Sequence, residues 1–429
     1  MANEQRKTLI VGSGCFGLST ARALLERGWT DVIVIDRATT LPAPDGTSND
    51  LNRIVRTSYS DPFYSKLASD AIKAWKNRDE WHDAYHESGV VVLGSPDSEY
   101  KHKAYLHDLE MGLRVEPLDN QTALRQVFPP EAAIANFENI TGYLNRDGGW
   151  ANAGQGVYLL MNQVRALGGK IHAGKAAVEL IQQGESLKTT GVRCSDGSVF
   201  EADLVVLATG PWTGSAFPDL PIGKIYQATG QCVAMVQLTP EEADAYRDCP
   251  VVLDVTSCFY IFPPTDQNLM KMGVHTGYTR SVGEKKISTP RTITSDPETG
   301  LLIPKANVRD IRDGLRKVYP TLVEKPFVAT RMCWYNESFD GDWVIGYHPK
   351  SEKSLMFATA GSGHAYKFLP SDEQIIGRLV ADAIEGKLSP EVATKFAVDR
   401  TPNNGDDFRL KMVREELDLN QLCTPEDLL

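Results

Sequence analysis

The chain has 429 residues, of which 42% are hydrophobic and 24% are charged, as in ordinary globular proteins. Its formal net charge of −11 leaves no excess of basic residues to neutralise phosphates, which argues against a nucleic-acid binder. The seven cysteines are scattered and show no metal-ligand spacing, so we expect no metal site, no disulfide framework and a reducing compartment.

The two ends of the chain carry no recognisable targeting signal. The first seven residues, MANEQRK, are polar and run directly into an apolar segment, so we expect no signal peptide. No run of 18 apolar residues is present, and we expect no membrane span. The last four residues, EDLL, differ from a peroxisomal Ser-Lys-Leu ending. These features favour a cytoplasmic protein.

The N-terminal region has the pattern of a βαβ unit. Thr8–Val11 is a short apolar strand, and Phe16–Arg27 has apolar residues at three- and four-residue steps, which predicts a helix. Gly28 follows as a C-terminal cap, and Asp31–Asp36 (DVIVID) is a β-branched strand that ends in a carboxylate. We therefore predict parallel strands joined by a helix.

The turn between the first strand and helix has the spacing G-x-G-x-x-G. Gly12 permits a tight turn, Gly14 lets a pyrophosphate approach the backbone, and Gly17 allows close packing of helix and strand. Asp36 lies 19 residues after Gly17, where its carboxylate can accept from ribose hydroxyls. The motif predicts dinucleotide binding but does not separate FAD from NAD. The residues assigned to cofactor binding here are Gly12, Gly14, Cys15, Phe16, Gly17, Asp36 and Arg37.

Two later segments repeat the pattern of an apolar strand that ends in small residues. They are Asp203–Gly210 (DLVVLATG) and Leu355–Gly363 (LMFATAGSG), and the second leads into a predicted helix, Ser371–Glu385. Because these strands are far apart in the chain, we expect one sheet assembled from distant segments.

The remaining segments favour a second sheet and several loops. Ala228–Val236 and Val251–Phe262 alternate in polarity, and each is predicted as a longer strand of an antiparallel sheet. Thr279–Pro304 is rich in Ser, Thr, Pro and Arg and is predicted as loop. The polar stretch from Arg400 onward is predicted as a surface tail.

Several motifs in the right order resemble the monomeric sarcosine oxidase family. That family includes pipecolate, saccharopine and fructosyl-amino-acid oxidases, and the likeness covers about residues 7–395. The motifs are Asn52–Tyr59 (NRIVRTSY), Phe259–Pro263 (FYIFP), Lys271–His275 (KMGVH), Arg331–Pro349 (RMCWYNESFDGDWVIGYHP) and Gly361–Pro370 (GSGHAYKFLP).

The resemblance implies a role for each matching residue. Cys333 would carry FAD through an 8α-thioether, and Arg53 would lie against the flavin ring. Arg56 and Lys367 would bind a substrate carboxylate, and Lys271 would activate oxygen. The further residues implied are Tyr260 and His275 in the substrate cavity, and Ser48, Gly361, Gly363, His364 and Lys367 in flavin binding.

The implied chemistry explains these residue types. Amine oxidation removes a hydride equivalent from the carbon beside nitrogen, and FAD supplies the redox chemistry. An arginine suits bidentate contact with a carboxylate, a lysine adds a point charge, and a cation stabilises the negative charge that develops on oxygen. Taken singly, each type has an ordinary role as well: a packed cysteine or histidine, a solvated lysine, or a surface arginine.

The substrate side of the resemblance is mixed. Val274 stands where the glycated-amino-acid branch has an acid, and Arg53 where that branch commonly has lysine, which favours sarcosine- or pipecolate-like substrates. Ser48–Leu51 and Asp147–Ala153 are instead similar to the fungal and glycated-substrate enzymes. A fructosyl-amino-acid oxidase or an oxidase of a biosynthetic pathway therefore stays open. So do a flavin dehydrogenase that does not use oxygen and a regulatory flavin-binding protein.

The expected fold is α/β (α+β), like D-amino-acid oxidase and glutathione reductase. A discontinuous Rossmann-like FAD-binding domain would comprise residues 1–90, 145–220 and 325–429, and an antiparallel-sheet substrate domain residues 91–144 and 221–324. The expected partners are a small amine or amino acid and O2, with no nucleic acid and no membrane, and we expect a monomer.

Overall fold

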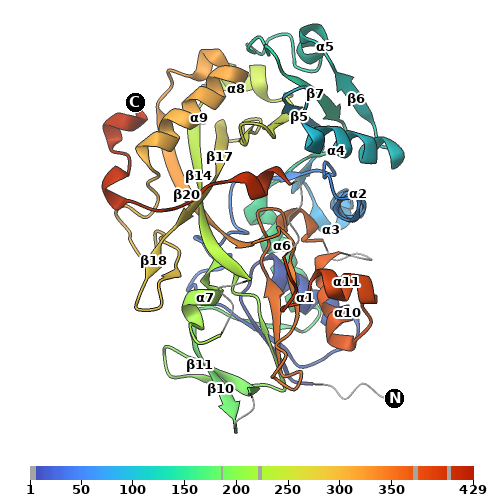
Figure 1. Cartoon of the computed structure of the whole chain (residues 1–429), viewed down its shortest axis with the longest axis vertical. Helices are drawn as coiled ribbons and strands as arrows, with labels where there is room; N and C mark the ends of the chain where they lie inside the picture. The colour runs from blue at the N-terminus through green and yellow to red at the C-terminus, as the bar shows by residue number, and fades with distance from the viewer. Residues whose placement is uncertain (1–5, 185–186, 221–224, 371–374, 403–406) are drawn as a thin grey trace.

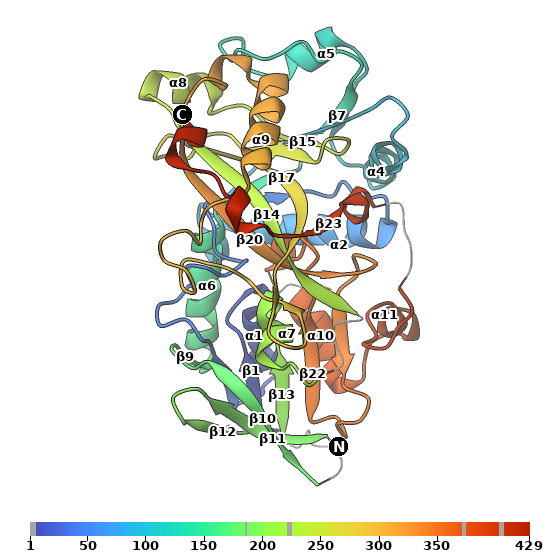
Figure 2. The ribbon, with the colours of Figure 1, turned by 60° about the vertical axis from the view of Figure 1, so that its left-hand side comes forward.

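The computed structural model describes residues 6–184, 187–220, 225–370, 375–402 and 407–429. Figures 1 and 2 show an elongated molecule with two lobes along its long axis. One lobe contains the N-terminal βαβ unit, and the other is built on a large twisted sheet. The C-terminal segment crosses the junction between the lobes in both views.

The first lobe is built on a six-stranded sheet. Its order is β21-β22-β13-β1-β2-β9, and all neighbours are parallel except β21, which pairs antiparallel with β22. The strands β1, β13 and β22 are buried along their length, as expected where both faces of a parallel sheet are covered. The expected assembly of one sheet from distant segments is confirmed. The strands are β1 (Thr8–Val11), β2 (Val32–Ile35), β9 (Lys170–His172), β13 (Leu204–Leu207), β21 (Val344–Tyr347) and β22 (Leu355–Thr359).

Helices pack on this sheet and on one another. Helix α1 contacts α10 and α6, and its close approach to α10 depends on Gly377, where an added Cβ would lie 2.3 Å from the carbonyl oxygen of Ser19. The helix predicted from Ser371 begins at Ile376, and residues 371–374 of that prediction lie outside the described residues. The lobe also contains α1 (Cys15–Glu26), α6 (Ala153–Ala166), η1 (Gly210–Trp212), α7 (Thr213–Ala216), α10 (Ile376–Glu385), α11 (Pro390–Lys395) and the antiparallel strands β10 (Ala177–Gln183), β11 (Lys188–Cys194) and β12 (Val199–Glu201).

The second lobe is built on a nine-stranded sheet. Its order is β20-β14-β17-β16-β15-β5-β7-β6, with β23 beside β17. Most neighbours are antiparallel, whereas β5 with β15 and β17 with β23 are parallel. Strand β14 pairs with both β17 and β20, so it joins the two strands that carry two of the family motifs. The strands are β5 (Val90–Gly94), β6 (Val115–Leu118), β7 (Thr141–Asn145), β14 (Tyr226–Gln237), β15 (Val251–Asp254), β16 (Phe259–Ile261), β17 (Leu269–Thr279), β20 (Phe327–Ser338) and β23 (Arg414–Glu416).

Four segments differ from their sequence-based predictions. Thr279–Pro304, predicted as loop, contains the short antiparallel pair β18 (Ser281–Val282) and β19 (Ile287–Ser288). The single strand predicted for Val251–Phe262 is an antiparallel pair, β15 and β16, because the chain turns at Cys258, which has a φ of 61°. Strand β20 lies within the residues 325–429 assigned to the FAD-binding domain, yet it hydrogen-bonds along β14 in the second lobe. The stretch after Arg400 was predicted as a surface tail, but β23 pairs with β17, and Arg409 is buried.

The other elements cover the second lobe and the junction. A small sheet, β3-β8-β4, lies beside the segment that leads into α2. In the described part of the chain, no helix is long and apolar enough to cross a membrane. These elements are β3 (Arg53–Val55), α2 (Pro62–Trp75), α3 (Arg78–Trp81), β4 (Tyr85–His86), α4 (Glu99–Glu110), α5 (Gln121–Gln126), β8 (Gly149–Ala151), α8 (Pro240–Tyr246), β18 (Ser281–Val282), β19 (Ile287–Ser288), α9 (Lys305–Val318), η2 (Pro320–Leu322), η3 (Tyr366–Phe368), η4 (Phe408–Lys411), η5 (Leu419–Gln421) and η6 (Pro425–Leu428).

Candidate active site

Two glycines of the glycine-rich turn between β1 and α1 have no room for a side chain. A Cβ added at Gly12 would lie 2.3 Å from the carbonyl oxygen of Ala208, and one at Gly17 would lie 1.9 Å from that of Gly12. Gly14 is the N-cap of α1, and it provides no side-chain hydrogen bond to the first turn. A helix start of this kind favours an anion through its N–H groups and its dipole.

A carboxylate and a hydroxyl flank this turn. Asp36 follows β2, and its carboxylate accepts from the Ser13 N–H and hydroxyl, both at 2.7 Å. The Ser48 hydroxyl oxygen accepts from the Cys15 N–H at 3.0 Å. Burial raises the pKa of the Cys15 thiol to about 11, so this cysteine is a neutral part of the turn.

An arginine also lines this cavity. The guanidinium carbon of Arg37 is 3.9 Å from the ring centroid of Trp212, and its Nη2 is 2.5 Å from the Asp45 carboxylate. Burial opposes ionisation of Asp45, but Arg37 and the Thr292 hydroxyl hold its pKa below the ordinary value.

These features line one cavity that extends from the glycine-rich turn to the residues after β22. The cavity combines glycines that exclude side chains, a helix N-terminus and a carboxylate at the end of the second strand. These three features together fit a bound dinucleotide. Gly17 does not line this cavity, because it packs against the backbone of the turn at Gly12. The residues predicted to bind the cofactor that line this cavity are Gly12, Gly14, Cys15, Phe16, Asp36, Arg37, Ser48, Arg53, Gly361, Gly363 and His364.

Cys333 is buried on β20, next to an arginine. The Nη2 of Arg53 donates to the Cys333 Sγ at 3.3 Å and to the Thr47 carbonyl oxygen at 2.8 Å. Arg53 also forms an ion pair with Asp50, so the same guanidinium joins the cysteine to a buried carboxylate.

Lys271 is almost fully buried, at 1% exposure, and forms an ion pair with Asp50. Its Nζ donates to the Asp50 carboxylate and to the Asn52 carbonyl oxygen, both at 2.8 Å. Burial lowers the pKa of Lys271 to about 8, and Asp50 opposes that shift. Burial also disfavours ionised Asp50, yet Arg53 and Lys271 hold its pKa far below the ordinary value.

A second cavity adjoins the first and carries the predicted carboxylate ligands. The Nζ of Lys367 donates to the Tyr59 hydroxyl at 2.7 Å and to the His364 carbonyl oxygen at 2.9 Å. Arg56 donates to the Tyr100 hydroxyl at 3.2 Å. Burial and then Arg56 lower the pKa of Lys367 well below its ordinary value. A bound carboxylate would relieve this repulsion and restore the charge. The residues that line both cavities are Arg53, Tyr335, Gly363, His364 and Tyr366.

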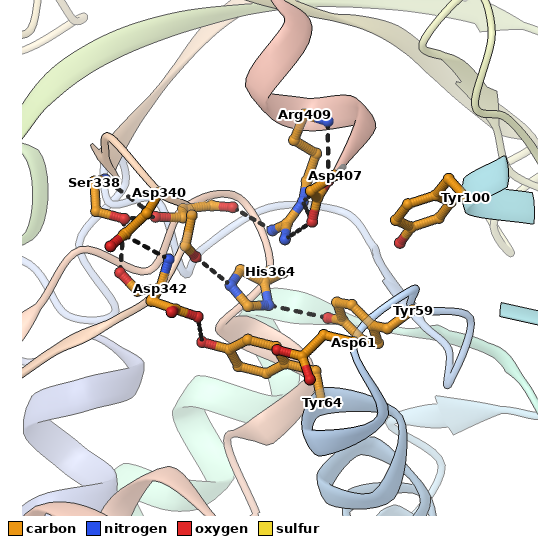
Figure 3. Close-up of polar contacts among 12 residues, drawn as sticks. Tyr59, Asp61, Tyr64, Tyr100, Ser338, Asp340, Asp342, His364, Asp407 and Arg409 are labelled. Atoms are coloured by element: carbon orange, nitrogen blue, oxygen red, sulfur yellow. Dashed lines mark hydrogen bonds and ion pairs between the residues drawn. The ribbon is translucent and has the colours of Figure 1, made fainter. Parts of the chain in front are cut away.

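The C-terminal segment completes this second cavity. Phe408 and Arg409 line it, and Figure 3 shows the Arg409 guanidinium held by Asp407, above His364 and Tyr59. Arg409 Nε donates to the Asp407 carboxylate at 2.9 Å, and its Nη1 donates to the Ser362 carbonyl oxygen at 2.6 Å. A segment predicted as a surface tail thus supplies part of the wall.

Histidine and tyrosine residues complete the site. His364 contacts the Tyr59 hydroxyl and the Gly341 carbonyl oxygen, each at 3.1 Å, as Figure 3 shows in part. Tyr260 and His275 both line the second cavity, as does Lys271. Burial raises the pKa of the Tyr260 hydroxyl well above the ordinary value, so it stays protonated.

Sequence reasoning missed four residues that the structure brings to this site. Tyr59 ends a quoted motif, and Asp50 lies three residues before Arg53, yet neither was given a role. Glu337 follows Cys333 by four residues, and strand periodicity was a signal that could have placed it on the same face. Arg409 carried no such signal, because the segment around it resembles any solvated terminus.

Comparisons with known proteins agree with this geometry. Residues 7–383 match the family described as FAD dependent oxidoreductase. L-saccharopine oxidase of Schizosaccharomyces pombe is 30% identical over 90% of this chain and 91% of its own length. Human peroxisomal sarcosine oxidase is 25% identical over 92% of this chain and 96% of its own length.

Solved structures show the same fold. Fructosamine oxidase from Aspergillus fumigatus (Amadoriase II) superposes with a TM-score of 0.78, at 25% identity, over 96% of this chain and 92% of the other. The resemblance noted in the sequence is therefore confirmed, and so is the α/β (α+β) fold class.

Proposed function

The chain belongs to the FAD-dependent oxidoreductase family, in its sarcosine oxidase-like group, and we propose that it oxidises a secondary amine that carries a carboxylate. The observation that carries the proposal is the junction of two cavities. A cradle suited to a dinucleotide opens, at Arg53 and Tyr335, into a cavity lined by Arg56 and Lys367. A substrate carboxylate bound by these two cations is thereby held beside the cofactor site.

FAD supplies the acceptor for the hydride equivalent, and the chain supplies binding, orientation and charge. Gly12, Gly14 and Asp36 would hold its ADP half, and the residues around Arg53 its flavin half. The proposal includes a covalent thioether at Cys333, supported by the burial of its thiol and by the Arg53 hydrogen bond.

Covalency is tested by acid precipitation. We expect the flavin colour to stay with the precipitated wild-type protein and to be released from a Cys333→Ser variant. Cys423→Ser is a matched control. Cys423 is also a buried free cysteine, but it precedes the helical turn η6 near the C-terminus and is not on β20. Flavin colour in the wild-type supernatant, with a colourless pellet, would contradict the covalent link.

Oxygen is the proposed electron acceptor, with hydrogen peroxide as product. Support comes from Lys271, a buried cation that Asp50 and the Asn52 carbonyl hold in the wall of the second cavity. Such a cation stabilises developing superoxide charge. A Lys271→Met variant should reoxidise far more slowly while reduction changes less. Peroxide yield per turnover distinguishes an oxidase from a dehydrogenase that passes electrons elsewhere.

The substrate is identified by anaerobic reduction of the bound flavin with a panel of amines. The panel contains sarcosine, L-pipecolate, L-proline, saccharopine, N-methylated aromatic amino acids and fructosyl-amino acids. We expect bleaching of the flavin band by one class and slower bleaching in a Lys367→Met variant. Lys350→Met is the control, since Lys350 is exposed. Absence of bleaching with every member would contradict the proposal and favour a regulatory flavin-binding role.

The proposal also retains a monomer, supported by the likeness to a monomeric oxidase family. Light scattering coupled to size-exclusion chromatography measures this, with 47.3 kDa expected. A mass of twice that value would contradict it.

A further inference from the structure

A buried acid, Glu337, lies next to the histidine of the substrate cavity. Glu337 is on β20 and has 3% exposure, and its Oε1 is 3.4 Å from His275 Nε2. Its other oxygen accepts from the Thr229 hydroxyl on β14 at 2.7 Å. His275 lines the substrate cavity, and its Nε2 has no hydrogen-bond partner among the described residues. The imidazole thus lines the cavity and also lies 3.4 Å from the acid, at a contact that does not meet hydrogen-bond geometry.

Strand geometry places this pair beside the other active residues. Along β20, Glu337 is separated from Cys333 and Tyr335 by an even number of positions. The same holds for His275 and Lys271 along β17. Residues two apart on a strand share a face, and β14 holds both strands in one sheet. The pair therefore follows from the same sheet register that brings the cysteine and the lysine together.

Two other carboxylates near the substrate cavity are paired with cations. Asp50 pairs with Lys271 and Arg53, and Asp407 pairs with Arg409. Over the described ranges of the chain, Glu337 has no lysine or arginine within ion-pair distance, and its Oε1 lies 3.4 Å from His275 Nε2. Glu337 can therefore take up a proton without breaking an ion pair with lysine or arginine.

The electrostatic surroundings support that capacity. Burial raises the pKa of Glu337 to about 7, opposed by the Thr229 hydroxyl and by the charges of Arg414 and Arg409. Burial and then Arg409 lower the pKa of His275 to about 4, while Asp407 acts in the opposite direction. The pair therefore takes up or releases a proton near neutral pH, and the acid rather than the imidazole holds it.

A proton acceptor is needed because the substrate arrives protonated. An aliphatic amine is an ammonium ion at neutral pH, and an ammonium nitrogen has no lone pair to assist loss of hydride from the neighbouring carbon. The cavity wall is rich in basic side chains, and their charges disfavour the ammonium ion. A general base in hydrogen-bond reach accelerates such transfers by roughly 10²–10⁴-fold.

We propose that Glu337, acting through His275, accepts the proton of the substrate ammonium group before amine oxidation. The N–H bond breaks, its electron pair stays on nitrogen, and the proton passes through the imidazole to the carboxylate, which becomes a carboxylic acid. The inference rests on the proposed oxidation of secondary amines. Glu337 is a positioning residue in this scheme, since it acts on the substrate through the histidine.

The experiment is the pH profile of anaerobic flavin reduction, with the panel amine that bleaches the wild type. We expect the wild-type rate constant to rise through an apparent pKa near 7. In Glu337→Gln, which keeps the shape and the Thr229 contact, this limb should be lost or shifted upward. The rate at pH 7 should fall about tenfold or more, and it should recover toward the wild type above pH 9.

Three further measurements make the outcome unambiguous. Glu337→Asp should restore the limb in part, and Glu116→Gln should leave the profile unchanged, because Glu116 is on β6 with a half-exposed side chain that pairs with Arg146. In the wild type, two substrates that differ in amine pKa should show the same apparent pKa in their rate profiles. This measurement does not depend on any variant folding correctly. The proposal would be overturned if the apparent pKa of the wild-type profile changed with the pKa of the substrate amine. It would also be overturned if Glu337→Gln lowered the rate constant equally at every pH. Failure of the amine-oxidase proposal is distinct: no panel member would then reduce the wild type at any pH.

Discussion

Replacing Asp50 by Asn tests the charge cluster that joins Cys333 and Lys271. The substitution keeps the side-chain shape but removes the anion that faces Lys271 Nζ at 2.8 Å and also pairs with Arg53. At an effective dielectric constant of about 20, two charges at this distance attract by roughly 6 kcal/mol. Removing one partner of a buried pair costs about 3–5 kcal/mol in practice, because the other charge stays buried.

This cost converts to a measurable thermal shift. With an unfolding entropy of about 2.1 cal/mol/K per residue, the 429 residues give about 0.9 kcal/mol/K, so Tm should fall by about 3–6 °C. The control is Asp219→Asn, whose pair with Lys285 is at the surface, with the Asp219 side chain 92% exposed, and which should leave Tm unchanged. A double variant, Asp50→Asn with Lys271→Met, should lose less than the two single variants together.

The same substitution should slow the reaction of the reduced flavin with oxygen. The pKa of Lys271 is already lowered to about 8 and is supported by Asp50, so loss of the carboxylate leaves the lysine mostly neutral at pH 7.5. We expect reoxidation to slow about tenfold at pH 7.5, measured by stopped flow, with a smaller effect on reduction. An unchanged Tm together with unchanged reoxidation would refute this account of the cluster.

Three other predictions follow from individual contacts. Glu337 has its pKa raised to about 7, above its unfolded value, so its contribution to stability is full below about pH 4.5 and is lost as the pH rises to about 7. Glu337→Gln should therefore gain about 3 kcal/mol relative to the wild type between pH 4.5 and 8 in thermal melts, and a constant difference would contradict this. Lys367→Met should raise KM about tenfold or more for substrates with a carboxylate and leave amines without one unaffected, because its Nζ lies in the cavity wall; equal effects on both would exclude the clamp. Gly17→Ala should lower the amount of flavin that the protein incorporates during expression and should lower Tm, because its Cβ would lie 1.9 Å from the Gly12 carbonyl oxygen; full flavin incorporation would show that the turn can move.

The sequence alone determined the parts of this protein that depend on local spacing. The residues Gly12, Gly14 and Gly17 follow a strand and open a helix, so their purpose could be derived from a stretch of six residues. The alternation along β20 likewise fixes which side chains share the face of Cys333, because the strand period is two. The roles of Cys333, Lys271 and Lys367 came from family motifs rather than from physical pattern.

Tertiary structure decided which charges meet. Asp50 and Lys271 are 221 residues apart, and nothing in either local segment shows that they form a buried pair. The break between β15 and β16 was missed because Asp254 and Thr256 continue the alternation expected of one longer strand, whereas Thr256 and Ser257 form a turn in the structure. Arg409 stands in a polar stretch that is indistinguishable from a solvated terminus until β23 docks on β17 and draws it into the cavity. Burial of a charge is a property of the surfaces that enclose it, and those surfaces come from distant parts of the chain.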